Sequence, residues 1–203
     1  YDNAQFVLLI SKFLKINRNE RFEKKAIQTI EFINKNFLNP ESNLLGSAYD
    51  ADSEGEEGKY YVFNYSELKD IKDIEQYFDV TSGGNWENKI ILREIKTPPD
   101  SIIMKLKDLR EKKTKPFFDN KIQLDLNCLW VSALISAEKI LPKNNYLQTA
   151  ETYYYNLEKT FFKEDRLYHT NSKTSVFLED YAYAIAMLLD LSDQTLKPNY
   201  LFK

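Results

Sequence analysis

The sequence has a single cysteine, Cys128, among its 203 residues. One cysteine excludes a disulfide within the chain and any CxxC motif. The apolar segment around Cys128 also offers it no partner histidine, so we predict an inert buried thiol rather than a nucleophile. Cysteine usage says little about the compartment, and a cytoplasmic location is the default expectation.

Long apolar runs and a basic surplus are missing as well. No stretch of about 18 or more apolar residues occurs, so no membrane span is predicted. The 31 acidic and 28 basic residues give a net charge of −3, and no basic stripe is present. No nucleic-acid partner is therefore expected. The length and the 43% hydrophobic content suffice for a sizeable core.

The hydrophobic pattern predicts pairs of helices, each with a strongly apolar member followed by an amphipathic one. Residues 1–16 and 124–141 are apolar on nearly every side, as in helices surrounded by neighbours. Residues 20–38 and 146–162 each have one apolar stripe and one polar face. A third strongly apolar segment, 177–191, opens another pair. The pattern predicts an all-α fold with an internal repeat of helix pairs.

This alternation is typical of a ring of helical hairpins, in which inner helices contact neighbours on every side and outer helices face water. We therefore predict an incomplete (α/α)6 barrel, with an open solenoid of hairpins as the alternative. The predicted helices do not close a ring, and Tyr1 opens directly into an apolar helix. We expect residues 1–203 to be one partial barrel domain of a longer protein.

A segment of different character, residues 47–123, separates the first helix pair from the second. Within it we predict a short helix near 66–78 with Ser66 as its N-cap, an extended segment at 90–93, and a charged helix near 101–113. We interpret this segment as an insertion in the barrel rather than as an independent domain.

The insertion begins with an acidic loop, which we predict to be a loop or hairpin bent at its glycines. Asp50, Asp52 and Glu54 match positions one, three and five of a calcium-binding loop, and Gly55 matches position six. Tyr61 stands where such a loop needs a bidentate glutamate, which excludes an EF-hand. A looser cation site at this loop is a hypothesis; no other metal site and no cofactor are predicted.

The inner helices of such a ring run parallel, so their N-termini share one rim. Partial positive charge at helix N-termini favours carboxylates and anionic or hydroxyl-rich ligands there. Connections from the outer helices reach the same rim, which adds the acidic loop and the segment 164–177. The candidate catalytic residues are Asp125, Glu179 and Asp180. The candidate substrate-binding residues are Asp50, Asp52, Glu54, Asn127, His169 and Tyr181.

These residues also have simpler interpretations. Aspartate and asparagine at helix starts commonly act as caps, so Asp125 and Asp180, each taken singly, could simply be helix caps. His169 is the only histidine and lies among polar residues, where a surface or hydrogen-bonded role competes with that of a base. The functional interpretation depends on all of these side chains meeting at one rim.

Four segments of the sequence resemble a known family in the same order. They are SAYDADSEGEEGKYYVFNYSELKDI, YFDVTSGGNWENKIIL, DNKIQLDLNCLWVSALISA and VFLEDYAYAIAMLLDL. They resemble the thioredoxin-like, spermatogenesis-associated family of large bacterial and animal proteins. In that family a thioredoxin-like domain precedes a barrel of paired helices similar to six-hairpin glycosidases and N-acylglucosamine 2-epimerases. The resemblance implies a central barrel fragment, with the thioredoxin-like domain and the C-terminal portion outside this chain.

The sequence departs from the family at two positions of interest. The family's Asp-Trp-Asn-Gly string reads Asp125-Leu126-Asn127-Cys128 here, which keeps the polar pair but loses a ring that could stack on a sugar. Phe63 stands after the acidic loop, where the family usually has an aromatic residue, often tryptophan. The family's redox motif lies outside this chain, so no thiol activity is assigned to it.

Three interpretations of function remain open from the sequence. The first is a carbohydrate-related barrel, hydrolase-like or epimerase-like, with a saccharide ligand. The second is a non-catalytic scaffold or interaction module derived from such an enzyme, with the missing domains of the same protein as partners. The third is a fragment that self-associates through helix faces which the missing hairpins should cover.

Overall fold

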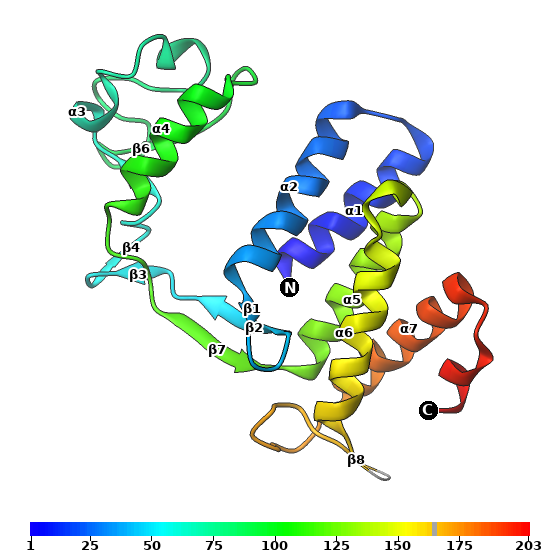
Figure 1. Cartoon of the computed structure of the whole chain (residues 1–203). Helices are drawn as coiled ribbons and strands as arrows, with labels where there is room; N and C mark the ends of the chain where they lie inside the picture. The colour runs from blue at the N-terminus through cyan, green and yellow to red at the C-terminus, as the bar shows by residue number, and fades with distance from the viewer. Residues whose placement is uncertain (164–165) are drawn as a thin grey trace. The chain divides into compact units, whose positions relative to one another are not determined.

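The computed structural model describes residues 1–163 and 166–203 of the chain. The protein is predominantly helical and has several short antiparallel strands (Figure 1). The chain divides into two compact units, which we treat separately. The helical unit comprises Tyr1–Ala48 and Asp119–Lys203, and the insert unit comprises Tyr49–Phe118. The predicted insertion, 47–123, thus closely matches the insert unit.

The helical unit contains all the long helices that the sequence predicts for it. Its α-helices are α1 (Asp2–Ile16), α2 (Glu20–Asn36), α5 (Leu124–Glu138), α6 (Tyr146–Phe161) and α7 (Leu178–Thr195). Short 3-10 helices follow α5 and α7, at η2 (Pro142–Asn144) and η3 (Pro198–Phe202).

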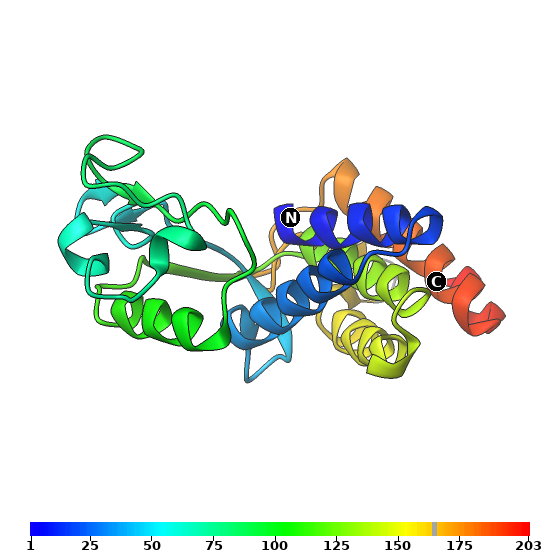
Figure 2. The same cartoon turned by 90° about the horizontal axis from the view of Figure 1, so that it is seen from above.

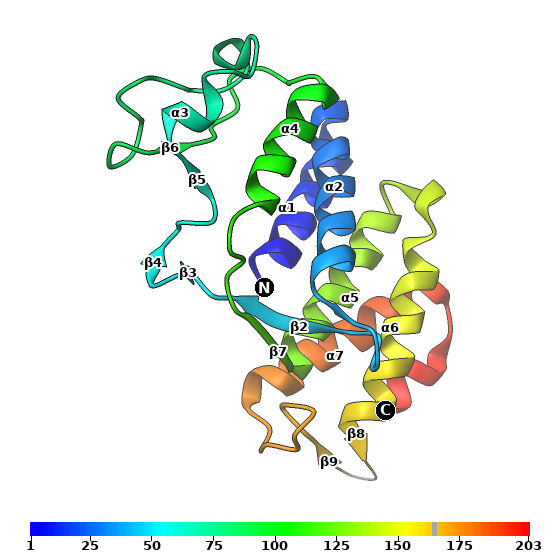
Figure 3. The ribbon, with the colours of Figure 1, turned by 60° about the vertical axis from the view of Figure 1, so that its left-hand side comes forward.

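Helix α5 is the centre of the helical unit. It packs against α1, α6 and α7, while α2 packs against α1 (Figures 1 and 3). Side chains on every side of α5 are buried, among them Trp130, Leu134 and Ile135. This confirms the prediction of an inner helix, because only a helix enclosed by others buries its whole circumference.

Helix α1 is buried on one side only, which corrects the prediction of burial on nearly every side. Val7 and Leu14 are buried, whereas the side chains of Leu9 and Ile16 are 67% and 89% exposed. The reason is that α2 and α5 pack against one face of α1 and leave these apolar residues of the other face in contact with solvent.

Helix α7 shows the same asymmetry. Met187 and Leu191 are buried, whereas Leu178, Ile185 and Leu189 lie along an exposed face. An exposed apolar stripe of this kind commonly marks an interaction surface in a soluble protein. No helix in the described part of the chain combines the length and apolarity needed to cross a membrane.

Helices α1, α5 and α7, which the sequence predicts as the inner helices, run in the same direction, as predicted (Figures 1 and 2). Ile10 and Leu14 in the second half of α1 pack with Ile140, which lies just beyond the end of α5. The first turns of α5 and α7 lie beside each other, because Asp125 and Asp180 approach closely there. The helix starts therefore gather at one end of the unit.

A small sheet closes that end of the helical unit. Strands β1 (Leu38–Asn39), β2 (Leu44–Tyr49) and β7 (Phe118–Ile122) form it in the order β1-β2-β7. Strands β8 (Phe162–Lys163) and β9 (Arg166–Leu167) pair antiparallel after α6. The two-residue strands β1, β8 and β9 are too short to give the alternating pattern that identifies a strand in sequence. Residues 164–165 of the predicted rim segment 164–177 lie outside the described residues.

The insert unit has its own hydrophobic cluster, in which Phe63, Leu68, Ile90 and Leu106 are buried. Its elements are β3 (Asp52–Ser53), β4 (Glu56–Glu57), β5 (Val62–Phe63), α3 (Tyr65–Leu68), η1 (Ile74–Gln76), β6 (Ile90–Ile91) and α4 (Asp100–Glu111). Strand β5 pairs with β6, which brings the two halves of the unit together.

Two local features of the insert unit refine the sequence prediction. The helix expected at 66–78 is α3 followed by the separate turn η1, and its N-cap is Asn64 rather than Ser66. Asn64 N–H donates to the Glu67 carboxylate at 2.7 Å, as in a capping box. Ser66 lies two residues later, already inside α3, and so cannot be the N-cap. The acidic loop is a β3–β4 hairpin, as predicted, with Glu54 and Gly55 both at positive φ. Two such residues give the turn the twist that hairpin strands require.

Candidate functional site

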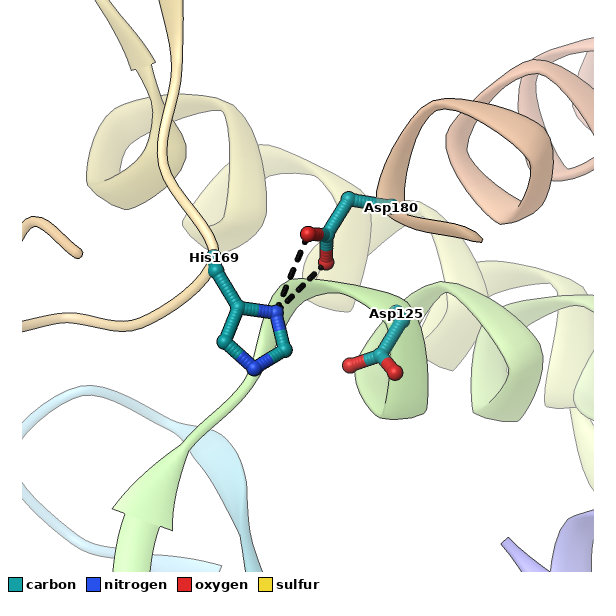
Figure 4. A group of neighbouring side chains, drawn as sticks. All are labelled: Asp125, His169 and Asp180. Atoms are coloured by element: carbon teal, nitrogen blue, oxygen red, sulfur yellow. Dashed lines mark hydrogen bonds and ion pairs between the residues drawn. The ribbon is translucent and has the colours of Figure 1, made fainter. Parts of the chain in front are cut away.

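Three polar side chains from distant parts of the sequence meet where α5 and α7 begin. Asp125 lies in the first turn of α5, Asp180 in the first turn of α7, and His169 in the connection before α7 (Figure 4). One ligand atom from each of the three lies within 4.8 Å of the other two. We call this group the Asp125–His169–Asp180 cluster.

Backbone pairing fixes His169 beside the start of α5. The His169 carbonyl accepts a hydrogen bond from Leu124 N–H at 2.9 Å, and Asn171 N–H donates to the Ile122 carbonyl at 3.2 Å. Gln123 and Thr170 form an antiparallel bridge between these two contacts. The connection thus behaves as a short extra strand along the residues that precede α5, and this places the imidazole next to Asp125.

Asp180 is the most buried member of the cluster, with a side chain that is 0% exposed. As the third residue of α7, it accepts a hydrogen bond from the Phe177 N–H at 2.8 Å and so caps the helix. Its two carboxylate oxygens also lie 2.9 and 3.0 Å from His169 Nδ1. The Phe177 ring meets the imidazole edge-on at 4.9 Å and covers it. Asp180 therefore holds both the helix start and the ring of His169.

Asp125 differs from Asp180 in having a buried oxygen with no partner. Its Oδ1 is buried, and no described residue donates a hydrogen bond to it. Burial raises the pKa of the Asp125 carboxyl above its ordinary value, and the nearby charge of Asp180 raises it further. The backbone N–H of Leu126 and the imidazole of His169 act in the opposite direction and only partly offset the rise.

A second layer of polar groups supports the other side of His169. Its Nε2 lies 3.1 Å from the side-chain nitrogen of Gln123. The Oγ of Ser47 lies 2.6 Å from Gln123 Oε1 and 2.6 Å from the Lys121 carbonyl. Sequence reasoning missed Ser47 and Gln123. The available signal was the position of Gln123 immediately before the first residue of α5, which makes it the N-cap.

Asn127, predicted to bind substrate, has its amide engaged within the fold. Its Oδ1 accepts from Leu45 N–H at 2.8 Å, and its Nδ2 donates to the carbonyls of Leu45 and Gln123 at 3.0 and 2.9 Å. The residue is 1% exposed. These bonds join the start of α5 to strand β2, so the structure gives Asn127 a structural role.

The other two residues predicted at the start of α7 point away from the cluster. Glu179 is exposed, and the side chain of Tyr181 is 44% exposed. Successive helix residues face different directions, so Asp180 alone of this triplet is turned toward α5. Sequence adjacency did not distinguish these three residues.

The acidic-loop residues Asp50, Asp52 and Glu54 belong to the insert unit. Asp50 accepts a hydrogen bond from Asp52 N–H at 3.1 Å, and Glu54 forms an ion pair with Lys59 at 3.2 Å. Among the described residues, the Asp125–His169–Asp180 cluster is the only group of three metal-compatible side chains within mutual reach. The loop thus lacks the convergence that a cation site requires.

The insert unit contains a cavity of about 370 Å³ that the sequence did not indicate. Lys59, Lys89 and Lys113 line it together with Glu54 and Glu67. Each lysine forms an ion pair: Lys59 with Glu54, Lys89 with Glu56 and Lys113 with Glu67. Three of the lysines that line this cavity therefore have their charge offset by a nearby carboxylate.

Cys128 is fully buried on α5. Burial raises the pKa of its thiol far above the ordinary value, and the charges of Asp125 and Asp180 act in the same direction. Because a protonated thiol is a poor nucleophile, the structure confirms the prediction of an inert cysteine.

Comparison with known proteins adds no relative to this picture. No family model matches the chain, and no curated protein matches it.

Proposed function

We propose that the helical unit is part of an (α/α)6 barrel that performs acid/base chemistry on a carbohydrate at the Asp125–His169–Asp180 cluster. One observation carries the proposal: two carboxyl groups and the only imidazole, from three separate segments, converge at the shared end of the inner helices. Acid/base chemistry on a glycosidic bond uses a pair of carboxyl groups, and the positive ends of helix dipoles favour carboxylates in the first turns of α5 and α7. The resemblance to the thioredoxin-like, spermatogenesis-associated family supports the same barrel.

Asp125 is the proton-transferring group in this proposal. Its raised pKa keeps its proton to a higher pH than an ordinary aspartate does, which suits a general acid. Asp180 is a positioning residue, because it is wholly buried and acts through its hydrogen bonds to His169 Nδ1. His169 retains 14% side-chain exposure and is the member that a ligand hydroxyl can approach beside Asp125.

A saccharide screen tests the proposal. Saturation-transfer NMR detects binding of mono- and disaccharides, and proton NMR of the same samples follows hydrolysis or inversion at a carbon centre. We expect Asp125→Asn to lower the rate about 100-fold or more, because general acid/base catalysis typically contributes that much. Glu179→Gln, one residue outside the cluster, is the matched control and should retain the rate. A saccharide processed equally fast by Asp125→Asn would contradict the assignment.

The exposed apolar faces of α1 and α7 favour a second candidate, a non-catalytic interaction module. Leu9, Ile16, Leu178, Ile185 and Leu189 are each more than half exposed. Burying such faces against further helices removes apolar surface from water, at about 25 cal/mol per Å². In this alternative the helical unit binds other helices, from the same protein or from a second copy.

Light scattering distinguishes the second candidate. We expect concentration-dependent association of the chain, reduced by Ile185→Glu combined with Leu189→Glu on α7. Ile95→Glu alters an equally exposed isoleucine in the insert unit, 64% exposed, and should leave association unchanged. A chain that stays monomeric at all concentrations would contradict binding of a second copy through these faces.

A further inference from the structure

We propose that the Asp125–His169–Asp180 cluster binds a divalent cation of the zinc class, through His169 Nδ1 and one carboxylate oxygen from each aspartate. The ion would bind at the site of the proposed sugar chemistry and regulate that chemistry, so this role rests on the proposed function. Ion binding itself requires no saccharide. Three steps lead to it: the geometry of the donors, the hydrogen-bond requirements around Gln123, and the unpartnered oxygen of Asp125.

The donors are of the right kind and nearly in place. Zinc takes imidazole nitrogen and carboxylate oxygen ligands at about 2.0–2.2 Å, so neighbouring ligand atoms in a tetrahedral site lie roughly 3.4 Å apart. His169 Nδ1 lies 2.9 and 3.0 Å from the two oxygens of Asp180, and all three donors fall within 4.8 Å. Small side-chain rotations bring these atoms to coordinating positions while the helices stay where they are.

The hydroxyl of Ser47 reveals how the far side of His169 is protonated. It has a single proton but lies 2.6 Å from two oxygens, the Lys121 carbonyl and Gln123 Oε1. In one of those two contacts, two oxygens therefore face each other with no hydrogen between them. Exchanging the oxygen and nitrogen of the Gln123 amide resolves the conflict, because the amide NH₂ then donates to Ser47 Oγ while Ser47 donates to Lys121.

The exchanged amide turns its oxygen toward His169 Nε2, which must then carry a hydrogen. With Nε2 protonated, a neutral imidazole points the lone pair of Nδ1 at the carboxylate of Asp180, 2.9 Å away. Two acceptors in contact repel each other, so a positive charge has to lie between them. Either a proton between Nδ1 and Asp180 or a metal ion supplies that charge.

The free oxygen of Asp125 favours the metal ion. A proton on Nδ1 would be donated in a hydrogen bond to Asp180, whose oxygens lie 2.9 and 3.0 Å from Nδ1. That hydrogen bond would leave Asp125 Oδ1 buried without a partner. A metal ion accepts donors from several directions and engages Asp125, His169 and Asp180 together. A buried oxygen without a partner is costly, and ion binding removes that cost.

The surrounding charge and the second layer fit a metal. With both aspartates ionised and the imidazole neutral, as a bound metal requires, the carboxylates contribute −2 and the starts of α5 and α7 roughly +0.5 each, so the site offers a cation a net charge near −1. The nitrogen donor favours zinc-class ions over magnesium or calcium, which prefer oxygen alone. Metal-bound histidines usually donate their other N–H to a neighbouring acceptor, and Gln123, held by Ser47, supplies that acceptor.

The single histidine makes a direct test possible. In protein labelled with ¹⁵N-histidine and stripped with EDTA, every imidazole signal belongs to His169. On titration with zinc chloride we expect the Nδ1 resonance to move to the metal-bound range, with Nε2 remaining an N–H, at one ion per chain. An Nδ1 that remains an N–H in excess zinc overturns the proposal. This measurement on the unmodified chain does not depend on any variant folding.

Calorimetry with variants locates the ion. Asp125→Asn should abolish the zinc heat that Glu179→Gln retains, and Gln123→Leu should weaken affinity about tenfold or more through loss of the supporting acceptor. Equal affinity in Asp125→Asn and the unmodified chain would place zinc elsewhere and overturn the proposal. Saccharide turnover is measured separately in EDTA, so failure of the sugar proposal and failure of zinc binding are distinguishable. If both hold, zinc occupies Asp125 and suppresses turnover.

Discussion

The Asp180 carboxylate that caps α7 by accepting from Phe177 N–H also lies 2.9 Å from His169 Nδ1. A helix start and an imidazole are thereby fixed by one fully buried side chain. Because the carboxylate serves both, its removal has consequences for stability as well as for the cluster.

We expect Asp180→Ala to destabilise the protein by about 3 kcal/mol. The substitution removes the acceptor of the Phe177 N–H and the buried hydrogen-bond partner of His169 Nδ1. Urea denaturation followed by circular dichroism measures the change. Glu179→Ala removes the neighbouring exposed carboxylate and should change stability by no more than about 0.5 kcal/mol. Equal effects of the two substitutions would show that the double role of Asp180 does not stabilise the fold.

The raised pKa of Asp125 predicts a pH-dependent difference between the protein and Asp125→Asn. A carboxyl whose pKa rises on folding binds its proton more tightly in the folded state, so its ionisation opposes folding. We expect Asp125→Asn to be the more stable protein at neutral pH in EDTA. Its advantage should shrink as the pH falls through the raised pKa and vanish below the ordinary value of 3.8. An advantage that grows on acidification would contradict the assigned direction.

Asn127→Ala should destabilise the helical unit by about 3 kcal/mol. The substitution removes the amide partner of three backbone groups, including the N–H and carbonyl of buried Leu45. Asn120→Ala changes an exposed asparagine on β7 and is the control, with an expected effect within about 0.5 kcal/mol. Chemical denaturation of both variants decides whether Asn127 joins β2 to α5 as described.

Two adjacent glycines in the insert unit should respond differently to alanine. A Cβ at Gly84 would lie 2.5 Å from the Lys89 carbonyl, at a φ of +75°, so both the contact and the backbone oppose it. At Gly83 a Cβ meets nothing within 4 Å. We expect Gly84→Ala to cost about 1 kcal/mol or more and Gly83→Ala to be neutral or slightly stabilising. Hydrogen exchange of amides in the insert unit measures both, and equal protection in the two variants would contradict the structure.

The thiol of Cys128 should not react with thiol reagents in the native protein. It is fully buried with a raised pKa, so a thiol reagent such as DTNB finds neither access nor thiolate. We expect reaction of one equivalent in guanidinium and almost none under native conditions. Rapid native labelling would mean that α5 opens far more readily than its complete burial suggests.

The sequence predicted the helices well because their hydrophobic patterns are long. The strongly apolar segment 124–141 and the one-faced segment 146–162 became α5 and α6 within a few residues of their predicted ends. Segment 1–16 misled in one respect: apolar residues all round predicted an enclosed helix, yet Leu9 and Ile16 are exposed. The hydrophobic pattern of a helix indicates which of its faces can be buried, but it does not indicate whether another helix is present to bury them.

The site was only partly predictable for a related reason. Parallel inner helices placed Asp125 and Asp180 at one end, and this followed from the repeat of helix pairs. The selection of Asp180 over Glu179, and the engagement of Asn127 by Leu45, depend on the direction of single side chains. The supporting contact between Gln123 and Ser47 depends on β2 lying beside the residues before α5, and β2 begins with three consecutive buried residues rather than an alternating pattern.

The rings of Tyr49 and Phe118 stack at 4.8 Å where the insert unit begins and ends. The last residue of β2 and the first of β7 are therefore adjacent in space, so the insert unit leaves and rejoins the chain at one place. A loop closed in this way can change in length without moving apart the segments on either side of it, which here carry the imidazole and its two carboxylates.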